Sequence, residues 1–385
     1  MRIQAGVVSL LASSALAARP FLNEPDTGIE DVLKFSSNGS LPDIKSIVGL
    51  PDFEYVARNY LPVRNFTYYR NGAAGEYSYR NNLEVFRRYS LRPRVLVDIS
   101  NIESTLSTTI LGHNFSAPFF ISPCARADYA HADAEINFVK GAAAGNILYM
   151  PALFAQRSIE DIAAAKKPGQ VLFQQLYLES NETFNKELFA RTEKAGAKAI
   201  IFTVDSAADG NRHRAARFGV GSADSSYSAF SWSFYEQLRN QTKLPIILKG
   251  IMTVEDAEEA IRRKVPAIIL SNHGGRQLDG SPSALEVALE MYEKDPKMFQ
   301  KIEVLADGGI RYGVDAIMLL SLGVKAVGLG RPFMYSNIYG QAGVEKVIQI
   351  MKHEIAIDAG NMGIPDLKKI SPDFVEWKKP NGWAM

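Results

Sequence analysis

The chain has 385 residues, of which 46% are hydrophobic and 22% are charged, and these proportions are those of an ordinary globular protein. Its formal net charge of +1 generates no field that would draw it to nucleic acid or to an anionic membrane. Its single cysteine, Cys124, excludes an intramolecular disulfide framework and a cysteine-based zinc site, and we expect no metal centre. A chain of this length can be stabilised by its hydrophobic core alone.

The first residues have the features of a secretory signal peptide. Arg2 precedes an apolar run over residues 5–16, and Ala15-Leu16-Ala17 matches a small-residue cleavage pattern. Because the run is too short to span a bilayer, we expect cleavage of residues 1–18 and a mature protein that is secreted or enters an endomembrane compartment, without stable membrane insertion. An apolar N-terminus that is not cleaved is the alternative. Sequons for N-glycosylation support secretion weakly and begin at Asn38, Asn65, Asn114, Asn181 and Asn240.

The rest of the chain divides by pattern. Residues 19–117 form a segment with one helical pattern, from Asp52 to Asn59, and residues 378–385 form a tail. Between them, in residues 118–377, short apolar runs alternate with helical patterns. The apolar runs cover residues 118–122, 147–152, 171–176, 199–204, 245–249, 267–271, 302–306 and 326–329. Each is apolar along nearly its whole length, as a parallel strand buried on both faces requires.

Amphipathic helices are expected between and after these strands. They cover residues 134–144, 159–165, 185–195, 234–241, 254–263, 283–294, 313–321 and 344–359. Capping pairs such as Ser158 with Asp161, and Thr253 with Asp256, mark helix starts. Repeated strand–helix units predict an α/β fold, a (β/α)8 TIM barrel with an N-terminal helical extension. An open doubly wound sheet is the alternative, but no G-x-G-x-x-G sequence follows the first strand.

The turns after the last two strands have the composition of a phosphate site. They contain Gly308-Gly309-Ile310-Arg311 and Gly328-Leu329-Gly330-Arg331. Glycines allow backbone N–H groups to approach an anion closely, and arginines add charge-assisted hydrogen bonds. The loops after strands 7 and 8 often bind phosphate in this fold, so we expect a phosphate there. Glycines that serve tight turns alone are the alternative.

A histidine and several charged residues follow the middle strands. His273 lies in a glycine-flanked turn, and Asp205 ends a nearby strand; a carboxylate that orients an imidazole makes it a better base. Arg276 and Arg212 can bind a substrate carboxylate in forked geometry. A structural histidine is the alternative. Lys249 is either a Schiff-base lysine or a group that stabilises negative charge on a cofactor, and its position alone leaves both readings open.

The segment Ser271-Asn272-His273-Gly274-Gly275-Arg276-Gln277-Leu278-Asp279 resembles the signature of the FMN-dependent 2-hydroxy-acid dehydrogenase/oxidase family. That family includes glycolate oxidase, lactate oxidase, mandelate dehydrogenase and the flavin domain of flavocytochrome b2. The resemblance extends from Tyr55 to Trp377 in the family's order. It implies FMN as the cofactor and the oxidation of an (S)-2-hydroxy acid to a 2-oxo acid.

Roles follow from the resemblance by matched position. His273 resembles the family's base, Asp205 its carboxylate partner, and Arg276 with Arg212 the clamp on the substrate carboxylate. Lys249 resembles the lysine beside the flavin ring, which favours that role over a Schiff base.

The resemblance also implies pocket and cofactor contacts. Tyr68 and Tyr177 resemble the two pocket tyrosines, of which we assign Tyr177 to catalysis as well, and Phe154 is expected to contact the substrate. The residues expected to contact FMN are Pro123, Cys124, Ala125, Gln175, Thr203, Lys249, Ser271, Asp307, Gly308, Gly309, Arg311, Gly330 and Arg331.

The sequence departs from the family's pattern at three pocket positions. Ala152 stands where glycolate oxidases have a serine, Phe154 where they have a tryptophan, and Cys124 where a threonine is usual. These changes favour an acid that is bulkier or more apolar than glycolate. No His-Pro-Gly-Gly segment of a haem domain precedes the barrel, so we expect O2 as acceptor, with H2O2 as product, and a homo-oligomer that can be a tetramer.

Three other functions remain open at this point. The first is an FMN-dependent oxidase or dehydrogenase that tailors a carboxylic acid of secondary metabolism, including an amine-like one. The second is a protein that stores flavin without turnover, against which the intact set of His273, Asp205 and Arg276 argues. The third is a barrel lyase that uses Lys249 and no flavin.

Overall fold

The computed structural model describes residues 28–35, 39–221 and 230–378. The expected signal peptide, the sequon at Asn38 and most of the expected tail therefore lie outside the described residues. Within the described ranges, no helix is both long and apolar enough to cross a membrane.

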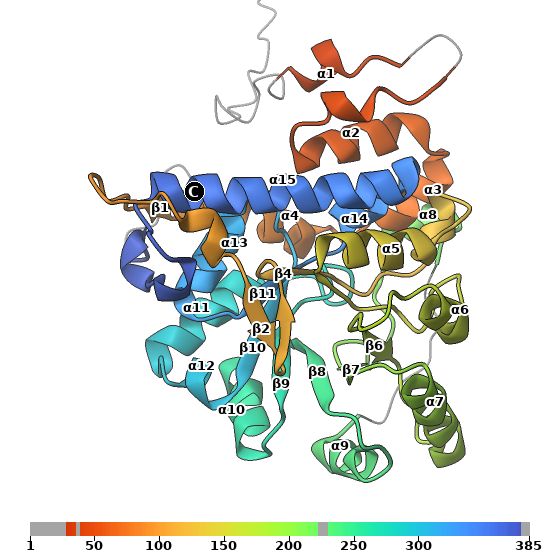
Figure 1. The fold of residues 1–385 in the computed structure, drawn as a ribbon. Coiled ribbons are helices and arrows are strands. Elements are labelled where there is room, and N and C mark those ends of the chain that lie inside the picture. The colour runs from red at the N-terminus through yellow and green to blue at the C-terminus, as the bar shows by residue number, and fades with distance from the viewer. Residues whose placement is uncertain (1–27, 36–38, 222–229, 379–385) are drawn as a thin grey trace, which may run out of the picture.

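Parallel strands form the centre of the molecule (Figure 1). They are β4 (Phe119–Ile121), β5 (Leu148–Tyr149), β6 (Phe173–Leu176), β7 (Ala199–Thr203), β8 (Ile246–Ile251), β9 (Ala267–Leu270), β10 (Glu303–Asp307) and β11 (Ala326–Leu329). Their order is β5-β4-β11-β10-β9-β8-β7-β6 in one 8-stranded sheet, and a parallel bridge between Tyr149 and Leu172 joins its two edges. The sheet is thus closed, which confirms the TIM barrel and every predicted strand.

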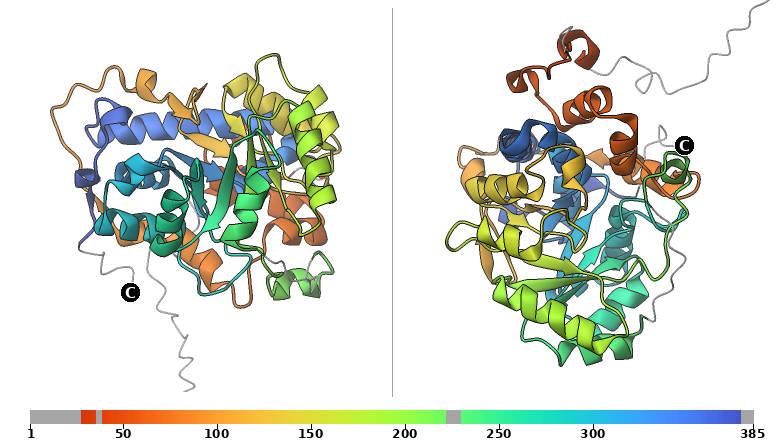
Figure 2. Two further views of the ribbon diagram at one scale, coloured as in Figure 1. Left: turned by 90° about the horizontal axis from the view of Figure 1, so that it is seen from below. Right: turned by 90° about the vertical axis from the view of Figure 1, so that its right-hand side faces the viewer.

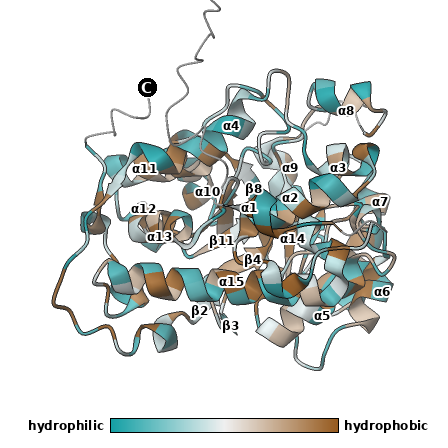
Figure 3. Ribbon diagram, turned by 90° about the horizontal axis from the view of Figure 1, so that it is seen from above, coloured by the Kyte–Doolittle hydropathy of each residue, from teal (hydrophilic) through white to brown (hydrophobic). Residues whose placement is uncertain are grey.

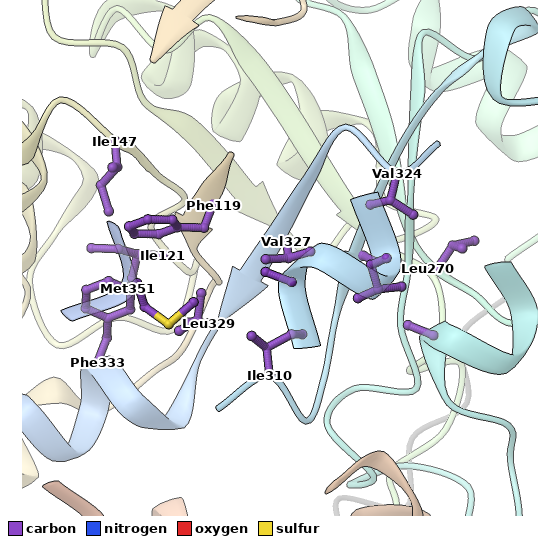
Figure 4. Close-up of a cluster of buried hydrophobic side chains, with 14 of the residues drawn as sticks. Phe119, Ile121, Ile147, Leu270, Ile310, Val324, Val327, Leu329, Phe333 and Met351 are labelled. Atoms are coloured by element: carbon purple, nitrogen blue, oxygen red, sulfur yellow. The ribbon is translucent and has the colours of Figure 1, made fainter. Parts of the chain in front are cut away.

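Side chains alternate between the two faces of each strand. Phe120, with Leu148, Phe173 and Leu305, belongs to a fully buried cluster inside the barrel. The neighbouring residues point outward and pack against the helices, as Figure 4 shows for Phe119, Ile121, Val327 and Leu329 near Phe333 and Met351. Burial on both faces explains why the strand segments are continuously apolar.

A hairpin that the sequence did not predict closes the amino-terminal end of the barrel. It consists of β2 (Thr108–Ile110) and β3 (His113–Phe115). Ile110 and Phe115 join the cluster inside the barrel. The backbone N–H of Leu111 donates to a carboxylate oxygen of Glu303, the first residue of β10, at 2.9 Å. The opposite, carboxyl-terminal end of the barrel is therefore left for a functional site.

Helices surround the strands (Figure 2). They are α5 (Glu135–Gly145), α6 (Ile159–Ala164), α7 (Glu182–Lys194), α9 (Trp232–Arg239), α10 (Val254–Arg262), α11 (Ala284–Lys294), α13 (Gly313–Leu322) and α15 (Gly340–Asn361). The predicted caps are confirmed. The hydroxyl of Ser158 accepts a hydrogen bond from the backbone N–H of Asp161, and that of Thr253 accepts one from Asp256. The helix predicted over 185–195 begins earlier, since Asn181 caps it.

The last helix is also longer than predicted. α15 begins at Gly340 rather than at residue 344, shortly after α14 (Arg331–Ser336). It packs against α5, where Gly145 leaves room for Ile348. Figure 3 shows hydrophobic and hydrophilic residues alternating along α15, as expected for a helix with one buried face.

The N-terminal segment is a helical extension, as predicted. It contains α1 (Ile29–Val32), α2 (Leu50–Tyr60), α3 (Val63–Tyr69) and α4 (Tyr77–Glu84). α2, which includes the predicted range 52–59, packs on α14. A two-residue strand, β1 (Ser90–Leu91), pairs with β12 (Val375–Glu376). The extension is therefore joined to the barrel at several places and brings α3 and α4 to its carboxyl-terminal end.

Candidate active site

A cavity lies at the carboxyl-terminal end of the barrel. It encloses ≈ 710 Å³ of space, a volume that includes open solvent. Residues predicted for the site that line it are Tyr68, Pro123, Cys124, Ala125, Lys249, His273, Arg276, Asp307, Gly308, Gly309, Arg311, Gly330 and Arg331. The folded chain therefore brings together most of the predicted site around one space.

His273 is held by a buried carboxylate. Its Nδ1 lies 2.8 Å from Oδ1 of Asp205, whose side chain has no exposed surface. Because an ionised carboxylate only accepts hydrogen bonds, Nδ1 carries the proton and Nε2 is left to accept one. Gly250 makes room for the pair, since a Cβ at this residue would lie 2.6 Å from Cβ of Asp205.

The surroundings set the charge of both groups. Burial lowers the pKa of His273 below its ordinary value, and Asp205 opposes this only in part. Burial acts to raise the pKa of Asp205, but the charges of His273 and Lys249 outweigh it, so that the pKa is lowered. At neutral pH the carboxyl is ionised and the imidazole is neutral, which is the form a general base needs.

The backbone of His273 is fixed in an unusual conformation. Its φ of 58° lies in the left-handed region, which is uncommon for a residue other than glycine. Its N–H donates to Oγ of Ser271 at 3.0 Å. That hydroxyl donates to Oδ1 of Asp307 at 2.6 Å and accepts from Nζ of Lys249 at 2.9 Å. A hydrogen-bonded network thus connects the base to the strand ends below the cavity.

Lys249 remains a cation in this network. It is 4% exposed, and its Nζ lies 3.6 Å from Oδ2 of Asp307. Burial acts to lower its pKa, but Asp307 and Asp205 outweigh burial and the pKa is raised. A Schiff base requires an unprotonated amine, so this environment argues against the lyase interpretation and favours the stabilisation of negative charge.

Arg276 and Arg212 lie side by side. Nε of Arg212 donates to the backbone carbonyl of Arg276 at 2.9 Å, and its NH2 group donates to Gln277. Nε of Arg276 is buried and has no hydrogen-bond partner among the described residues. Burial, and then the charge of Arg276, lower the pKa of Arg212 to about 9. Two cations with an unused buried donor form a suitable site for a carboxylate.

The expected phosphate turn requires glycine. Gly308 and Gly309 have φ values of 103° and 89°, and a Cβ on Gly309 would lie 1.8 Å from the carbonyl oxygen of Asn82. Asn82 is also paired with Asn272, each amide donating to the other, at 2.8 and 2.9 Å. This buried pair connects the phosphate turn to the loop that contains His273.

The two arginines of the phosphate turns differ in their surroundings. Arg331 donates to the backbone carbonyls of Tyr69, Gly274 and Asn71 at 2.9, 3.0 and 2.7 Å. A guanidinium has five N–H groups, so Arg331 can hold the loops together and still donate to a phosphate. Arg311 donates to the carbonyl of the preceding residue at 2.9 Å. Both arginines line the cavity.

The other predicted site residues are not among those that line the cavity: Phe154, Gln175, Tyr177, Thr203, Asp205, Arg212 and Ser271. Nε2 of Gln175 donates to Oγ1 of Thr203 at 3.0 Å. The rings of Tyr177 and Phe154 are stacked with centroids 5.2 Å apart, and Phe154 is 62% exposed. Burial, followed by the charge of Asp205, raises the pKa of Tyr177, so its hydroxyl keeps its proton at neutral pH. The stacked rings of Phe154 and Tyr177 form the aromatic edge of the site.

Several supporting residues were not predicted. Ser122 donates to Oδ2 of Asp307 at 3.1 Å. It is the last residue of the first predicted strand, and this position at a strand end could have identified it as a site residue. Asn272 lies inside the signature segment. Gly250 follows Lys249 directly. Asn82 had no local signal, because it lies in the extension, far along the chain from the residues that it contacts.

The site combines a glycine-rich anion site, a buried lysine and a neutral histidine held by an ionised aspartate. No cluster of three or more potential metal-binding side chains occurs in the described part of the chain. The unused donor of Arg276 and the crowded glycine turn suit a phosphate-bearing organic cofactor beside an anionic substrate. Fold and site together define a barrel enzyme with a site suited to such a cofactor.

Comparison with known proteins identifies the family. The model of the family described as FMN-dependent dehydrogenase matches residues 57–225 and 222–377. The L-lactate dehydrogenase (cytochrome) of Wickerhamomyces anomalus is 32% identical over 386 residues, which cover 94% of this chain and 67% of that protein. The peroxisomal (S)-2-hydroxyacid oxidase GLO4 of Arabidopsis thaliana is 36% identical over 356 residues, covering 86% and 96%.

Solved structures agree with this result. A flavocytochrome b2 mutant with pyruvate bound has a TM-score of 0.84 and 34% identity, over 88% of each chain. A mandelate oxidase with 3,3-difluoro-2-hydroxy-3-phenylpropionic acid has a TM-score of 0.77 and 33% identity, over 83% of this chain and 96% of that chain. The protein belongs to the family of FMN-dependent dehydrogenases. It is an FMN-containing oxidoreductase of the 2-hydroxy-acid oxidase and dehydrogenase type.

The crowding around Gly309 leads to a prediction about cofactor binding. In Gly309→Ala the new Cβ must displace Asn82 or the turn itself, so we expect the Kd for FMN to rise by about tenfold or more. Titration of the FMN-free protein with FMN, followed by flavin fluorescence, measures this. The control is Gly169→Ala, at a similar φ of 78° but with no atom within 4 Å. Equal FMN affinities for the two variants would contradict the assignment of the turn.

Proposed function

We propose that this protein oxidises a 2-hydroxy acid to the 2-oxo acid with O2 as the acceptor and H2O2 as the second product, and that His273 is the base. The observation that carries the proposal is the buried hydrogen-bonded pair of His273 and Asp205 next to Arg276 and Arg212, with His273 and Arg276 lining the same cavity. The pair provides a neutral base, and the guanidinium groups provide a site for the carboxylate.

The side chains have distinct tasks in this reaction. Arg276 and Arg212 bind the substrate carboxylate and orient the hydroxyl-bearing carbon. Nε2 of His273 then accepts a proton from the substrate, and the imidazolium that forms is stabilised by the Asp205 carboxylate at 2.8 Å. Tyr177, which keeps its proton, can donate a hydrogen bond at the edge of the site.

FMN would be held by residues of the strand ends. Backbone N–H groups and the guanidinium groups of the turns at 308–311 and 330–331 suit its phosphate, and the Lys249 ammonium suits negative charge on its ring. When bound, FMN would supply the ring that accepts two electrons from the substrate and passes them to O2. The substrate loses two electrons and two protons in total, which appear in H2O2.

Replacement of the base tests the proposal. In His273→Gln we expect FMN to stay bound and its anaerobic bleaching by the best substrate to slow by about 10²–10⁴-fold, because the general base is absent. In the unchanged protein kcat/KM falls as the pH drops through the lowered pKa of His273, since a protonated imidazole cannot accept a proton.

The control is His353→Gln, on the exposed side of α15. It should bleach at the rate of the unchanged protein. Bleaching of His273→Gln at that same rate would show that another group is the base.

The aromatic edge favours a larger substrate than glycolate. The exposed ring of Phe154 is stacked on Tyr177, and the small Ala152 precedes Phe154 by two residues. A face of this kind binds an aryl or long alkyl side chain by apolar contact. The similarity to a mandelate oxidase with a phenyl-substituted acid bound agrees with this interpretation.

A panel of glycolate, lactate, mandelate and a long-chain 2-hydroxy acid tests the substrate class. We expect kcat/KM to be highest for mandelate or the long-chain acid, by about tenfold over glycolate, because a buried apolar side chain adds over 1 kcal/mol of binding. H2O2 production in air measures the rates. A preference for glycolate would contradict the proposal.

We propose further that the protein enters the secretory pathway. The signal-like residues 1–18 support this, as do three sequons on the surface: Asn114, Asn181 and Asn240 are exposed. Asn65 differs from them, because it is half-buried and its Nδ2, the atom that would receive a glycan, donates to the carbonyl of Tyr129 at 3.0 Å. The homo-oligomer expected from the resemblance stays a prediction.

Expression of the full chain in a eukaryotic secretion host tests this route. We expect the protein in the medium, without residues 1–18, and with glycans at Asn114, Asn181 and Asn240 but not at Asn65. Peptide mapping by mass spectrometry identifies both the new N-terminus and the occupied sites. Intracellular protein with an intact N-terminus would contradict the proposal.

A further inference from the structure

The substrate clamp has an electrostatic problem. Arg212 and Arg276 are adjacent, partly buried cations, and like charges repel more strongly where less water screens them. The repulsion is visible in Arg212, whose pKa is lowered to about 9 by burial and by Arg276. Before a carboxylate arrives, contacts outside the clamp must therefore keep the segment that contains Arg212 in place.

A partly buried ion pair fixes that segment. Arg214, on α8 (His213–Arg217), donates from Nε and NH2 to the two carboxylate oxygens of Glu76, both at 2.8 Å. The same carboxylate accepts from Arg70 at 3.2 Å and from the backbone N–H of Gly72 at 3.1 Å. Glu76 is only 6% exposed, so these contacts are made where replacing them by water is costly.

The environment keeps Glu76 ionised. Burial acts to raise its pKa, but hydrogen bonds and charges from Arg214 and Arg70 outweigh burial and lower the pKa to about 2. Its backbone has a φ of 62°, in the left-handed region. A non-glycine residue adopts this conformation at a cost, which is tolerated where surrounding contacts hold it.

The pair joins two segments that form the substrate pocket. Glu76 follows Tyr68 in the extension, and Arg214 follows Arg212 by two residues. A backbone hydrogen bond from Ala74 to the carbonyl of Asn211, at 2.6 Å, joins the same two segments. A shift of Arg214 would therefore move Arg212 with it.

We propose that Glu76 is a positioning residue, which holds Arg212 beside Arg276 through its two-point contact with Arg214 and thereby sets the affinity for the substrate carboxylate. Glu76 does not touch the substrate in this arrangement. The inference rests on the proposed function, because it assigns the two arginines to a carboxylate.

Variants of both partners test the inference. In Glu76→Gln and Arg214→Ala we expect KM for the best 2-hydroxy acid to rise by about tenfold, with kcat changed less than about threefold, because displacement of the clamp weakens binding of the carboxylate more than the proton transfer. The double variant should resemble the single variants, since both remove the same contact. Arg214→Lys keeps the charge without the forked geometry, and an intermediate KM is expected.

A second measurement does not depend on turnover. Titration of the FMN-loaded protein with benzoylformate, followed by the absorbance of bound FMN, gives a Kd that should rise in parallel with KM. The FMN content should stay that of the unchanged protein. Arg214 is 44% exposed at its side chain, so its variants are expected to fold even if Glu76→Gln does not.

The matched control is a second forked pair far from the cavity. Arg191 on α7 donates to Glu160 on α6 at 2.8 and 2.9 Å. Glu160→Gln and Arg191→Ala should leave KM and the benzoylformate Kd unchanged.

The inference is wrong if the Arg214 variants also leave both values unchanged, or if they lose FMN instead of carboxylate affinity. Failure of the unchanged protein to oxidise any acid would count against the proposed function, whereas a normal benzoylformate Kd in the variants counts against the role of Glu76.

Discussion

The hydrogen bond between His273 and Asp205 is the interaction on which the site depends. It is 2.8 Å long and lies where the carboxylate has no exposed surface. Burial keeps the imidazole neutral, while the carboxylate selects the tautomer that leaves Nε2 free. The bond is possible only because Gly250 has no side chain and because Ser271 holds the backbone of His273 in its left-handed conformation.

Charge balance is the second constraint. Lys249 and Arg276 line the cavity, and Arg212 donates to the backbone of Arg276. The buried carboxylates of Asp205 and Asp307 lie in the same region. Asp205 is paired with His273 and Asp307 with Lys249. In the described part of the chain, neither Arg212 nor Arg276 forms an ion pair with a carboxylate. Anionic ligands complete the balance, which gives a physical reason for a site that takes a carboxylic acid beside a phosphate-bearing cofactor.

The N-terminal extension supports this site rather than only preceding the barrel. Asn82 contacts the phosphate turn and Asn272, and Glu76 contacts Arg214. Through the carbonyls of Tyr69 and Asn71, the extension also binds Arg331. The extension, which lies outside the strand–helix repeat, is therefore connected to three parts of the site. These are the phosphate turn, the loop that contains His273 and the substrate clamp.

The sequence by itself determined the closed barrel and most of the site. Strands buried on both faces must be continuously apolar, and groups that follow such strands meet at one end of the barrel, so His273, Lys249 and the turn at Gly308 could be placed from local pattern. Only the tertiary structure decided the contacts of Asn82, which lies 190 positions from Asn272, and of Glu76, which lies 138 positions from Arg214. Contacts at such separations leave no periodicity in the sequence, because they depend on where the extension docks and on which side chains then become buried together.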